Sequence, residues 1–384
     1  MIKRNIYIMY AIALLQGMVF YAPVATLYRT AQGVTISQIT IIESIALILC
    51  LLFEVPWGWL ADRIGYKRTI LICNALYFVS KIVFWKAGDF FGFLVERILL
   101  AIVCAGLSGT DVSVLYCSAD EKNSHRVFSV YNALQTAGLL AASLIHAIWI
   151  GANYRMAGFM TVISYGIALL FSCMLVEVKH IGQHQQNMAG LGRSLKRVVT
   201  NKSLLLFLIA VAFLQQTHQT ITVFLSQLQY EKAGMSTSLI SIVYTVMMVF
   251  GLLGIFSAKF TRLTGEKRMM YLCFSVAALC CLVLAVDKRA WSSIVAVIML
   301  RVTFEVMQPL QTELQNRQVA SNERATALSI NAIIIDCSGA GISVLFGMIA
   351  EKNLSVAFLF GFGLCFIGMF LFHLSGRSGA KVDR

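Results

Sequence analysis

The chain has 384 residues, of which 59% are hydrophobic and only 13% are charged, and its mean hydropathy is +0.78. Soluble domains carry about 25% charged residues, so this composition excludes a soluble protein. The net charge of +13 could indicate nucleic acid binding, but basic loops facing an anionic membrane leaflet explain it better. We therefore expect a lipid bilayer, and no nucleic acid, as the surroundings of this protein.

A membrane-spanning helix needs roughly 20 mostly apolar residues, because it crosses a hydrocarbon core of about 30 Å. Segments of this kind follow one another along the whole chain. In chain order, the twelve predicted spans are residues 5–27, 36–60, 69–88, 90–117, 126–150, 156–178, 203–226, 236–260, 268–287, 290–314, 325–350 and 353–375. We therefore predict an all-α integral membrane protein with twelve transmembrane helices.

The positions of lysine and arginine predict the orientation, because basic residues are retained in cytoplasmic loops. With the N-terminus inside the cell, most basic residues between the spans are cytoplasmic. The few that then face the other side are Arg29, Lys86, Arg155, Lys232, Lys288, Arg289 and Lys352. We predict a multi-pass protein of the plasma (inner) membrane that is a monomer with both termini in the cytoplasm.

The chain also divides into two similar halves. The only long polar connection lies at 179–202, between a six-span half at 1–178 and a second six-span half at 203–384. Gly65 and Gly265 are 200 residues apart, and each is followed by one residue and then by Lys-Arg. These features predict two pseudo-symmetric six-helix bundles, a duplication that transporters use to place a site near the membrane midplane.

The segment "GWLADRIGYKR" resembles the G-x-L-A-D-R-x-G-R-K loop between the second and third helices of the major facilitator superfamily. Tyr66 stands where this loop usually has a basic residue. With the twelve spans and the repeat, the resemblance covers essentially the whole chain. It implies a secondary active transporter that works by alternating access, and not an enzyme. The matching residues are Gly58, Asp62, Arg63, Gly65, Lys67 and Arg68.

In that family the aspartate of this loop accepts hydrogen bonds from neighbouring helix ends in the outward-open state. The resemblance therefore implies that the matching residues form a conformational latch. Glu54 and Asp111 lie near the predicted cytoplasmic ends of their spans, and we expect them to be gate or latch partners. A simple basic anchor at the membrane surface is the alternative, but it explains Lys67 and Arg68 and leaves the Asp-Arg pair unexplained.

Two further segments bear on the branch of the family. The fourth span, "VERILLAIVCAGLSGTDVSVLY", resembles the arginine-containing fourth helix of the family, and a similar "SGTD" segment occurs in exporters. The fifth span lacks the Gly-Pro signature that is typical of drug/proton antiporters. The resemblance thus points to an exporter-like branch without indicating a multidrug antiporter.

Polar side chains form stripes along several predicted helices. On the seventh span they recur at helical spacing, and Arg97 and Asn132 belong to similar stripes on the fourth and fifth spans. Lipid cannot solvate these groups, so we predict that they line a central cavity for the substrate; hydrogen bonds between packed helices are the alternative. The seventh-span stripe includes Gln215, His218, Gln219 and Thr222.

Charged residues within spans are a further indication of function, because a charge near the bilayer centre costs roughly 2.5–3.5 kcal/mol on insertion scales. Arg301 and Glu305 lie one helical turn apart near mid-depth, and Asp336 lies at a similar depth. We predict that these three residues couple transport to protons, with a purely structural ion pair as the open alternative. For Glu43 and Lys81 we expect a structural salt bridge.

The leading hypothesis is proton-coupled efflux of a small organic solute. A proton-coupled nutrient importer is the first alternative, and a receptor or scramblase with the same fold is the second. We expect no metal site and no cofactor, because the ten cysteines show no ligand spacing and no nucleotide-binding G-x-x-x-x-G-K-[ST] loop occurs.

Overall fold

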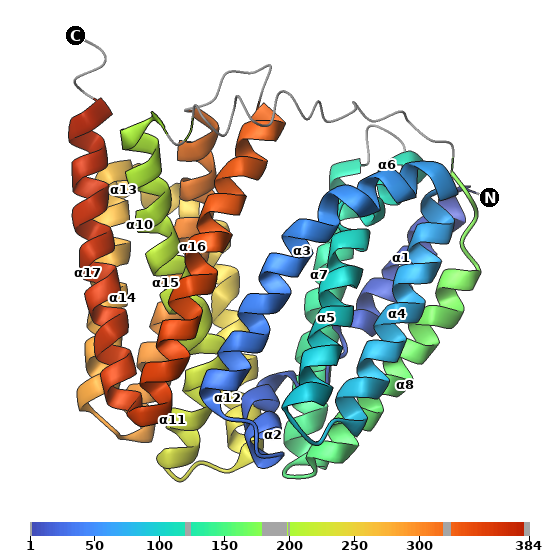
Figure 1. The fold of residues 1–384 in the computed structure, drawn as a ribbon, viewed down its shortest axis with the longest axis horizontal. Helices are drawn as coiled ribbons and strands as arrows, with labels where there is room; N and C mark the ends of the chain where they lie inside the picture. The colour runs from blue at the N-terminus through green and yellow to red at the C-terminus, as the bar shows by residue number, and fades with distance from the viewer. Residues whose placement is uncertain (1, 120–123, 179–197, 199, 318–323, 380–384) are drawn as a thin grey trace. The chain divides into compact units, whose positions relative to one another are not determined.

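The computed structural model describes residues 2–119, 124–178, 198, 200–317 and 324–379 (Figure 1). This part of the chain is helical apart from its turns, and it contains twelve helical segments long and apolar enough to cross a membrane. The predicted all-α fold with twelve spans is therefore confirmed. The spans are Lys3–Ala31, Ile36–Ile64, Tyr66–Lys86, Phe90–Ser118, Ser124–Ile150, Tyr154–Cys173, Lys202–Lys232, Thr237–Thr264, Glu266–Val286, Ala290–Arg317, Ala327–Lys352 and Leu354–Gly376.

The chain forms two compact units. Unit 1 comprises Met1–Gln183 together with Ser236–Thr245, and unit 2 comprises His184–Met235 and Val246–Arg384. The predicted halves, 1–178 and 203–384, stay a prediction, because the two units have other bounds and Ser236–Thr245 groups with unit 1. The predicted linker at 179–202 lies mostly outside the described residues, so its limits stay a prediction.

Unit 1 contains six spans, of which the first is interrupted. A short 3-10 segment with Pro23 separates α1 from α2, because proline has no N–H to continue the helical hydrogen bonds. α1 packs against α7 and α8, while α4 packs against α5 and α8 and α3 against α5. The elements are α1 (Ile2–Gly17), α2 (Ala25–Ala31), α3 (Ile36–Ile64), α4 (Tyr66–Lys86), α5 (Phe90–Leu107), α6 (Thr110–Ser118), α7 (Ser124–Ile145), the π segment His146–Ile150 and α8 (Tyr154–Cys173).

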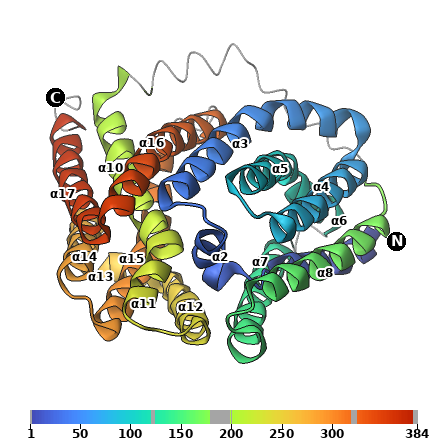
Figure 2. The same ribbon diagram turned by 60° about the horizontal axis from the view of Figure 1, so that its bottom comes forward.

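Unit 2 repeats these pairings. α10 packs against α16 and α17, and α14 packs against α15 and α17; Figure 2 shows α10, α14 and α17 side by side. The elements are α10 (Lys202–Gln219), the π segment Thr220–Leu225, α11 (Ser226–Lys232), α12 (Thr237–Gly251), the 3-10 segment Leu252–Phe256, α13 (Ser257–Thr264), α14 (Glu266–Val286), α15 (Ala290–Arg317), α16 (Arg324–Lys352) and α17 (Leu354–Gly379).

The repeat extends to the turns. Gly65 and Gly265 each form a one-residue turn between two helices, with φ of 89° and 82°. Residues other than glycine rarely adopt such positive φ angles. At the opposite ends of the units, Asn153 and Asn353 each cap the helix that follows with the side-chain oxygen. Both pairs are 200 residues apart, which matches the spacing expected from the sequence.

Candidate functional site

Unit 1 holds a buried group of five charged side chains, which we call the five-charge cluster. Its members come from four helices: Arg29 from α2, Glu43 from α3, Lys81 from α4, and Glu96 and Arg97 from α5. Arg29, Lys81 and Glu96 are at most 4% exposed, while about one fifth of Glu43 and of Arg97 is exposed. The cluster therefore has a buried interior and one accessible edge.

Two carboxylates hold the three cations of the cluster together. Glu43 lies 2.5 Å from Arg97 and 3.1 Å from Arg29. Glu96 lies between all three cations, at 3.8 Å from Lys81, 3.9 Å from Arg29 and 3.7 Å from Arg97. Three cations face two carboxylates, so the fully ionised cluster carries one excess positive charge.

Aromatic side chains surround the buried cations. Lys81 donates a hydrogen bond to the Tyr21 hydroxyl at 3.0 Å, and its Nζ lies 5.0 Å and 5.2 Å from the ring centroids of Tyr77 and Tyr165. The negative faces of aromatic rings attract cations, and this attraction is stronger where water is excluded. The rings thus offset part of the cost of burying the ammonium group.

The cluster corrects two sequence expectations. Arg97 lies at the accessible edge, and its predicted role in a substrate cavity stays a prediction. Lys81 was expected to pair with Glu43, but it pairs with Glu96, because Arg29 and Arg97 hold Glu43. Arg29 was assigned to a loop, but α2 carries it into the interior. Glu96 was missed, although its place beside Arg97 on an apolar helix was a signal that could have found it.

In unit 2, the predicted cavity residues lie on α10 and in the π segment after it. His218 and Thr222 are buried, Gln215 is half-buried and Gln219 is exposed. The His218 ring stacks on Phe304 of α15 with the ring centroids 4.0 Å apart. The Thr222 hydroxyl donates to the His218 carbonyl at 2.8 Å. The stripe is thus divided between a packed part and an accessible part, and Gln215 and Gln219 belong to the accessible part.

The Arg301–Glu305 pair lies on α15, where the predicted spacing brings the two side chains together. Arg301 Nη2 lies 2.5 Å from Glu305 Oε1, and each side chain is about one quarter exposed. Gly251 and Gly254 let a neighbouring segment approach closely: a Cβ at these positions would lie 3.2 Å from Arg301 Nε and 2.9 Å from the Glu305 carbonyl oxygen. Asp336 is half-buried on α16. The two side chains thus form an ion pair, and proton coupling by Arg301, Glu305 and Asp336 stays a prediction.

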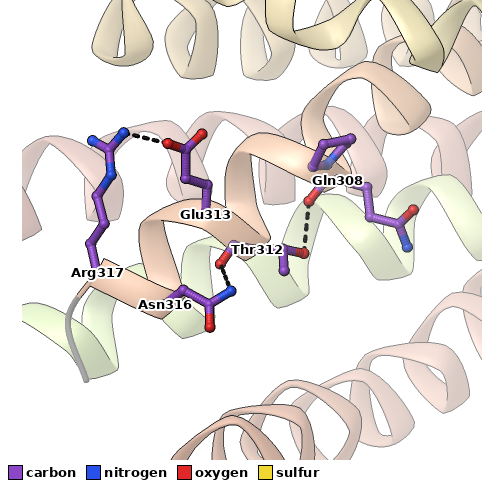
Figure 3. Close-up of a pocket in the computed structure, with 6 residues that line it drawn as sticks. Gln308, Thr312, Glu313, Asn316 and Arg317 are labelled. Carbon is purple, nitrogen blue, oxygen red and sulfur yellow. Dashed lines mark hydrogen bonds and ion pairs between the residues drawn. The ribbon is translucent and has the colours of Figure 1, made fainter. Parts of the chain in front are cut away.

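Further along α15, polar side chains line a cavity of ≈ 640 Å³. The Thr312 hydroxyl and the Asn316 amide donate to carbonyl groups of the same helix, and Glu313 pairs with Arg317 (Figure 3). The Gln308 amide lies beside them (Figure 3). Apart from Pro309, these lining residues offer hydrogen-bond donors, acceptors and charges of both signs. Such a lining suits a small polar solute better than a hydrocarbon.

The predicted latch residues are mostly helical, although the sequence suggested a loop. Gly58, Asp62 and Arg63 lie in α3, Lys67 and Arg68 lie in α4, and only Gly65 forms the turn between the two helices. The left-handed angle that Gly65 permits explains how one residue reverses the chain. Glu54 and Asp62 are exposed on α3. Arg63 stacks on the Trp59 ring at 3.8 Å.

The remaining gate residue, Asp111, lies on α6, and the predicted cavity residue Asn132 lies on α7. The Asp111 carboxylate of α6 accepts a hydrogen bond from the Tyr131 hydroxyl of α7 at 3.0 Å. Asn132, the next residue on α7, was predicted to line the cavity and is exposed. The structure thus gives Asp111 a partner within unit 1 that the sequence had not suggested.

One residue beside the Gly65 turn, Glu177, was not predicted from the sequence. Glu177, just after α8, accepts a hydrogen bond from the backbone N–H of Lys67 at 3.2 Å, and a Cβ on Gly65 would lie 2.9 Å from its carboxylate. A carboxylate near the first N–H groups of a helix is stabilised there. Asn5 positions this segment, since its amide both donates to and accepts from the Val176 backbone, at 2.8 Å and 2.9 Å. Glu177 therefore joins the Gly65 turn to the segment that follows α8.

Several solved structures share this fold. The nucleoside transporter NupG matches with a TM-score of 0.81 at 14% identity, over 96% of this chain and 98% of that chain. A bacterial homologue of the human lysosomal transporter Spinster matches with a TM-score of 0.75 at 15% identity, over 99% and 97%. A D-xylose-proton symporter matches with a TM-score of 0.73 at 14% identity, over 97% and 96%. Identities this low show the fold alone.

The sequence comparison with protein families gives the assignment. No curated protein sequence matches the chain. The family model described as Major Facilitator Superfamily matches residues 6–344, which is most of the chain. The class expected from the sequence, a transporter and not an enzyme, is therefore confirmed. The protein belongs to the major facilitator superfamily of secondary transporters.

Proposed function

We propose that this protein is a proton-coupled secondary transporter that moves a small organic solute by alternating access. The observation that supports the proposal is the presence, in each unit, of an arginine–carboxylate pair at 2.5 Å that is only partly exposed. The pairs are Glu43 with Arg97 in unit 1 and Glu305 with Arg301 in unit 2. All four residues lie within membrane spans.

Such a pair responds to a proton because protonation removes the charge of the carboxylate. The ionised pair is held by mutual attraction, which is strong where water is scarce. A protonated carboxyl no longer attracts the guanidinium, so the pair opens. Opening of the Glu43–Arg97 pair releases α3 from α5, whereas opening of the Arg301–Glu305 pair, which lies on one helix, frees the two side chains for other partners. About a fifth of Glu43 and a quarter of Glu305 is exposed, which gives protons access. Asp336 is the third candidate for the same role.

The polar stripes support a small solute with hydrogen-bonding groups. The cavity along α15 has a volume of ≈ 640 Å³ and a mixed polar lining, and ligand sites for small molecules commonly enclose about 300–1,000 Å³. Gln215 and Gln219 of unit 2 and Arg97 and Asn132 of unit 1 add accessible polar groups. We assign these residues to solute binding.

The direction of transport has two candidates. Efflux in exchange for protons is the direction indicated by the resemblance of the fourth span to exporters. Uptake together with protons is the second, and the structural similarity to a D-xylose-proton symporter favours it. We further propose that the Gly65 turn, Asp62 and Arg63 form the latch that stabilises one access state, with Glu54 and Asp111 as partners.

A transport assay tests these proposals. Growth of a deletion strain across a compound panel selects candidate solutes, which are then tested in proteoliposomes with an imposed pH gradient. Solute accumulation inside proteoliposomes that have an acidic lumen indicates exchange, because protons leave as solute enters. Accumulation inside proteoliposomes in an acidic external buffer indicates symport, because protons and solute enter together. No gradient-driven accumulation of any solute would refute coupling and favour a receptor or scramblase.

Substitutions then locate the coupling residue. Glu43→Gln, Glu305→Gln and Asp336→Asn each mimic a permanently protonated carboxyl. We expect at least one to abolish gradient-driven accumulation while solute exchange continues. Glu351→Gln, at an exposed helix end, is the control and should transport like the parent. If all three variants still accumulate solute, these carboxylates do not carry the driving proton.

A further inference from the structure

The end of unit 2 opposite the Gly265 turn carries an unusual set of lysines. Three helix ends meet there, those of α11, α14 and α16 (Figure 1). At each of them an acidic residue is followed directly by a lysine. The three pairs are Glu231-Lys232, Asp287-Lys288 and Glu351-Lys352.

The three lysines converge on one cavity of ≈ 310 Å³, and the three acids do not line it. The lining residues are Gln229, Lys232, Lys288, Lys352, Asn353, Leu354 and Ser355. Neighbouring residues at a helix end point in different directions, which separates each acid from its lysine. The Asp287 carboxylate is turned toward α15, where it accepts a hydrogen bond from the backbone N–H of Arg289 at 3.0 Å. This hydrogen bond lowers the pKa of Asp287 from its ordinary value.

The lysines have no anionic partner in the described part of the chain. None of the three forms an ion pair with another described residue. Lys232 and Lys352 occupy the last turns of α11 and α16, where a positive charge stabilises the helix. Lys288 lies two residues after α14 ends and two residues before α15 begins, so the favourable end of one helix and the unfavourable start of the next offset each other. Helix stability therefore does not explain the set.

The repeat provides an internal comparison. In unit 1, Arg155 donates hydrogen bonds to Gln32 Oε1 at 2.9 Å and to the Trp85 carbonyl, so a side chain of the unit occupies the corresponding place. Positions 200 residues later differ: Ser355 stands for Arg155, Lys232 for Gln32 and Lys288 for Gly88. The cation that fills the place in unit 1 is thus absent from unit 2, and lysines line the cavity instead.

We propose that this cavity binds a phosphate group, carried either by a phospholipid headgroup or by a soluble phosphate ester. Ammonium groups are compact point charges that bind phosphate. A phosphate offers three strong acceptor oxygens pointing in different directions. Three lysines from separate helix ends match this arrangement better than they match a planar carboxylate. The first turn of α17 faces the same cavity through Leu354 and Ser355 and adds its positive dipole end.

Two binding measurements test the site and identify the source of the phosphate. In neutral detergent, inorganic phosphate and glycerol 3-phosphate are titrated into the full-length protein by calorimetry. In nanodiscs of phosphatidylcholine with or without phosphatidylglycerol, native mass spectrometry counts the lipids retained by the protein. Binding in the first measurement indicates a soluble ligand, and selective retention of phosphatidylglycerol alone indicates a lipid headgroup.

The decisive variant is Lys232→Gln/Lys288→Gln/Lys352→Gln. We expect it to bind phosphate or retain phosphatidylglycerol about tenfold or more weakly than the parent, because charge-assisted hydrogen bonds are lost. The control is Arg289→Gln, which removes an exposed cation from the same turn as Lys288 but outside the cavity lining. Its binding should stay within about twofold of the parent. Equal binding by the parent and the triple variant in both measurements, or an equal loss in the control, would overturn the proposal.

Discussion

The charge balance of the five-charge cluster predicts that its members differ in importance. Removing Glu96 would leave three cations facing one carboxylate, whereas removing Lys81 would leave two of each sign. Glu96 lies 3.7–3.9 Å from each of the three cations. At an effective dielectric constant of about 20, each of these attractions amounts to roughly 4 kcal/mol before desolvation is subtracted.

We therefore expect Glu96→Gln to destabilise unit 1 strongly. Breaking a buried ion pair from one side costs about 3–5 kcal/mol, because uncompensated charge is left behind. Lys81→Met should cost less, about 1–2 kcal/mol. It removes the ion pair with Glu96 and the hydrogen bond to Tyr21, but Glu96 keeps both arginines and no unbalanced carboxylate is left behind. The double variant restores the original net charge and should recover part of the loss through a coupling energy of about 0.5–3 kcal/mol.

The assay measures the thermal stability of the purified protein in detergent. Its readout is the fraction of protein that remains monodisperse after heating, and the midpoint is the temperature at which half remains. Glu96→Gln should lower the midpoint by about 10 °C and Lys81→Met by about a third of that. Lys86→Met is the matched control, because Lys86 is an exposed lysine at the end of α4, the helix that carries Lys81. It should leave the midpoint unchanged. Equal damage by Lys81→Met and Glu96→Gln, or exact additivity in the double variant, would refute the argument from charge balance.

Three further predictions concern the helix contacts and the latch. Gly17→Ala should destabilise unit 1 by about 1–3 kcal/mol, because its Cβ would lie 2.1 Å from the Gln135 carbonyl oxygen; Gly363→Ala, with open space around it, is the control in the same heating assay. Gly65→Ala should reduce both thermal stability and transport, since φ of 89° strains any other residue and the methyl group meets Glu177; wild-type transport would contradict this. Asp62→Asn should preserve expression and reduce transport while changing which side admits a cysteine reagent, and unchanged labelling would remove Asp62 from the latch.

Much of the fold could be predicted from the sequence because the membrane imposes a simple rule. Each apolar stretch must span the bilayer as a helix, so the twelve spans and the 200-residue repeat are visible in composition and spacing. The i,i+4 spacing of Arg301 and Glu305 also fixes their contact, because both lie on one helix. These are local properties of the chain.

The five-charge cluster could be predicted only in part because it depends on rotation and depth of different helices. Arg29 follows a span by residue count, but Pro23 breaks that span and α2 carries the arginine inward. Glu43 and Lys81 were paired because their depths are similar, yet depth does not tell which faces of α3 and α4 meet. A helix face is fixed by packing against its neighbours, and one sequence does not contain that information. A search for all charges at a similar depth in the first four spans would have found Glu96.

The hydrogen bonds between Asn5 and Val176 join residues 171 positions apart in the sequence. They cannot form until the sixth span has been synthesised, because Val176 follows α8. They do not require any residue of the second half. The contacts of α1 with α7 and α8 have the same property. A ribosome that has released the first 180 residues or so has therefore supplied every partner that these interactions need, and the first bundle can close while the second is still being translated.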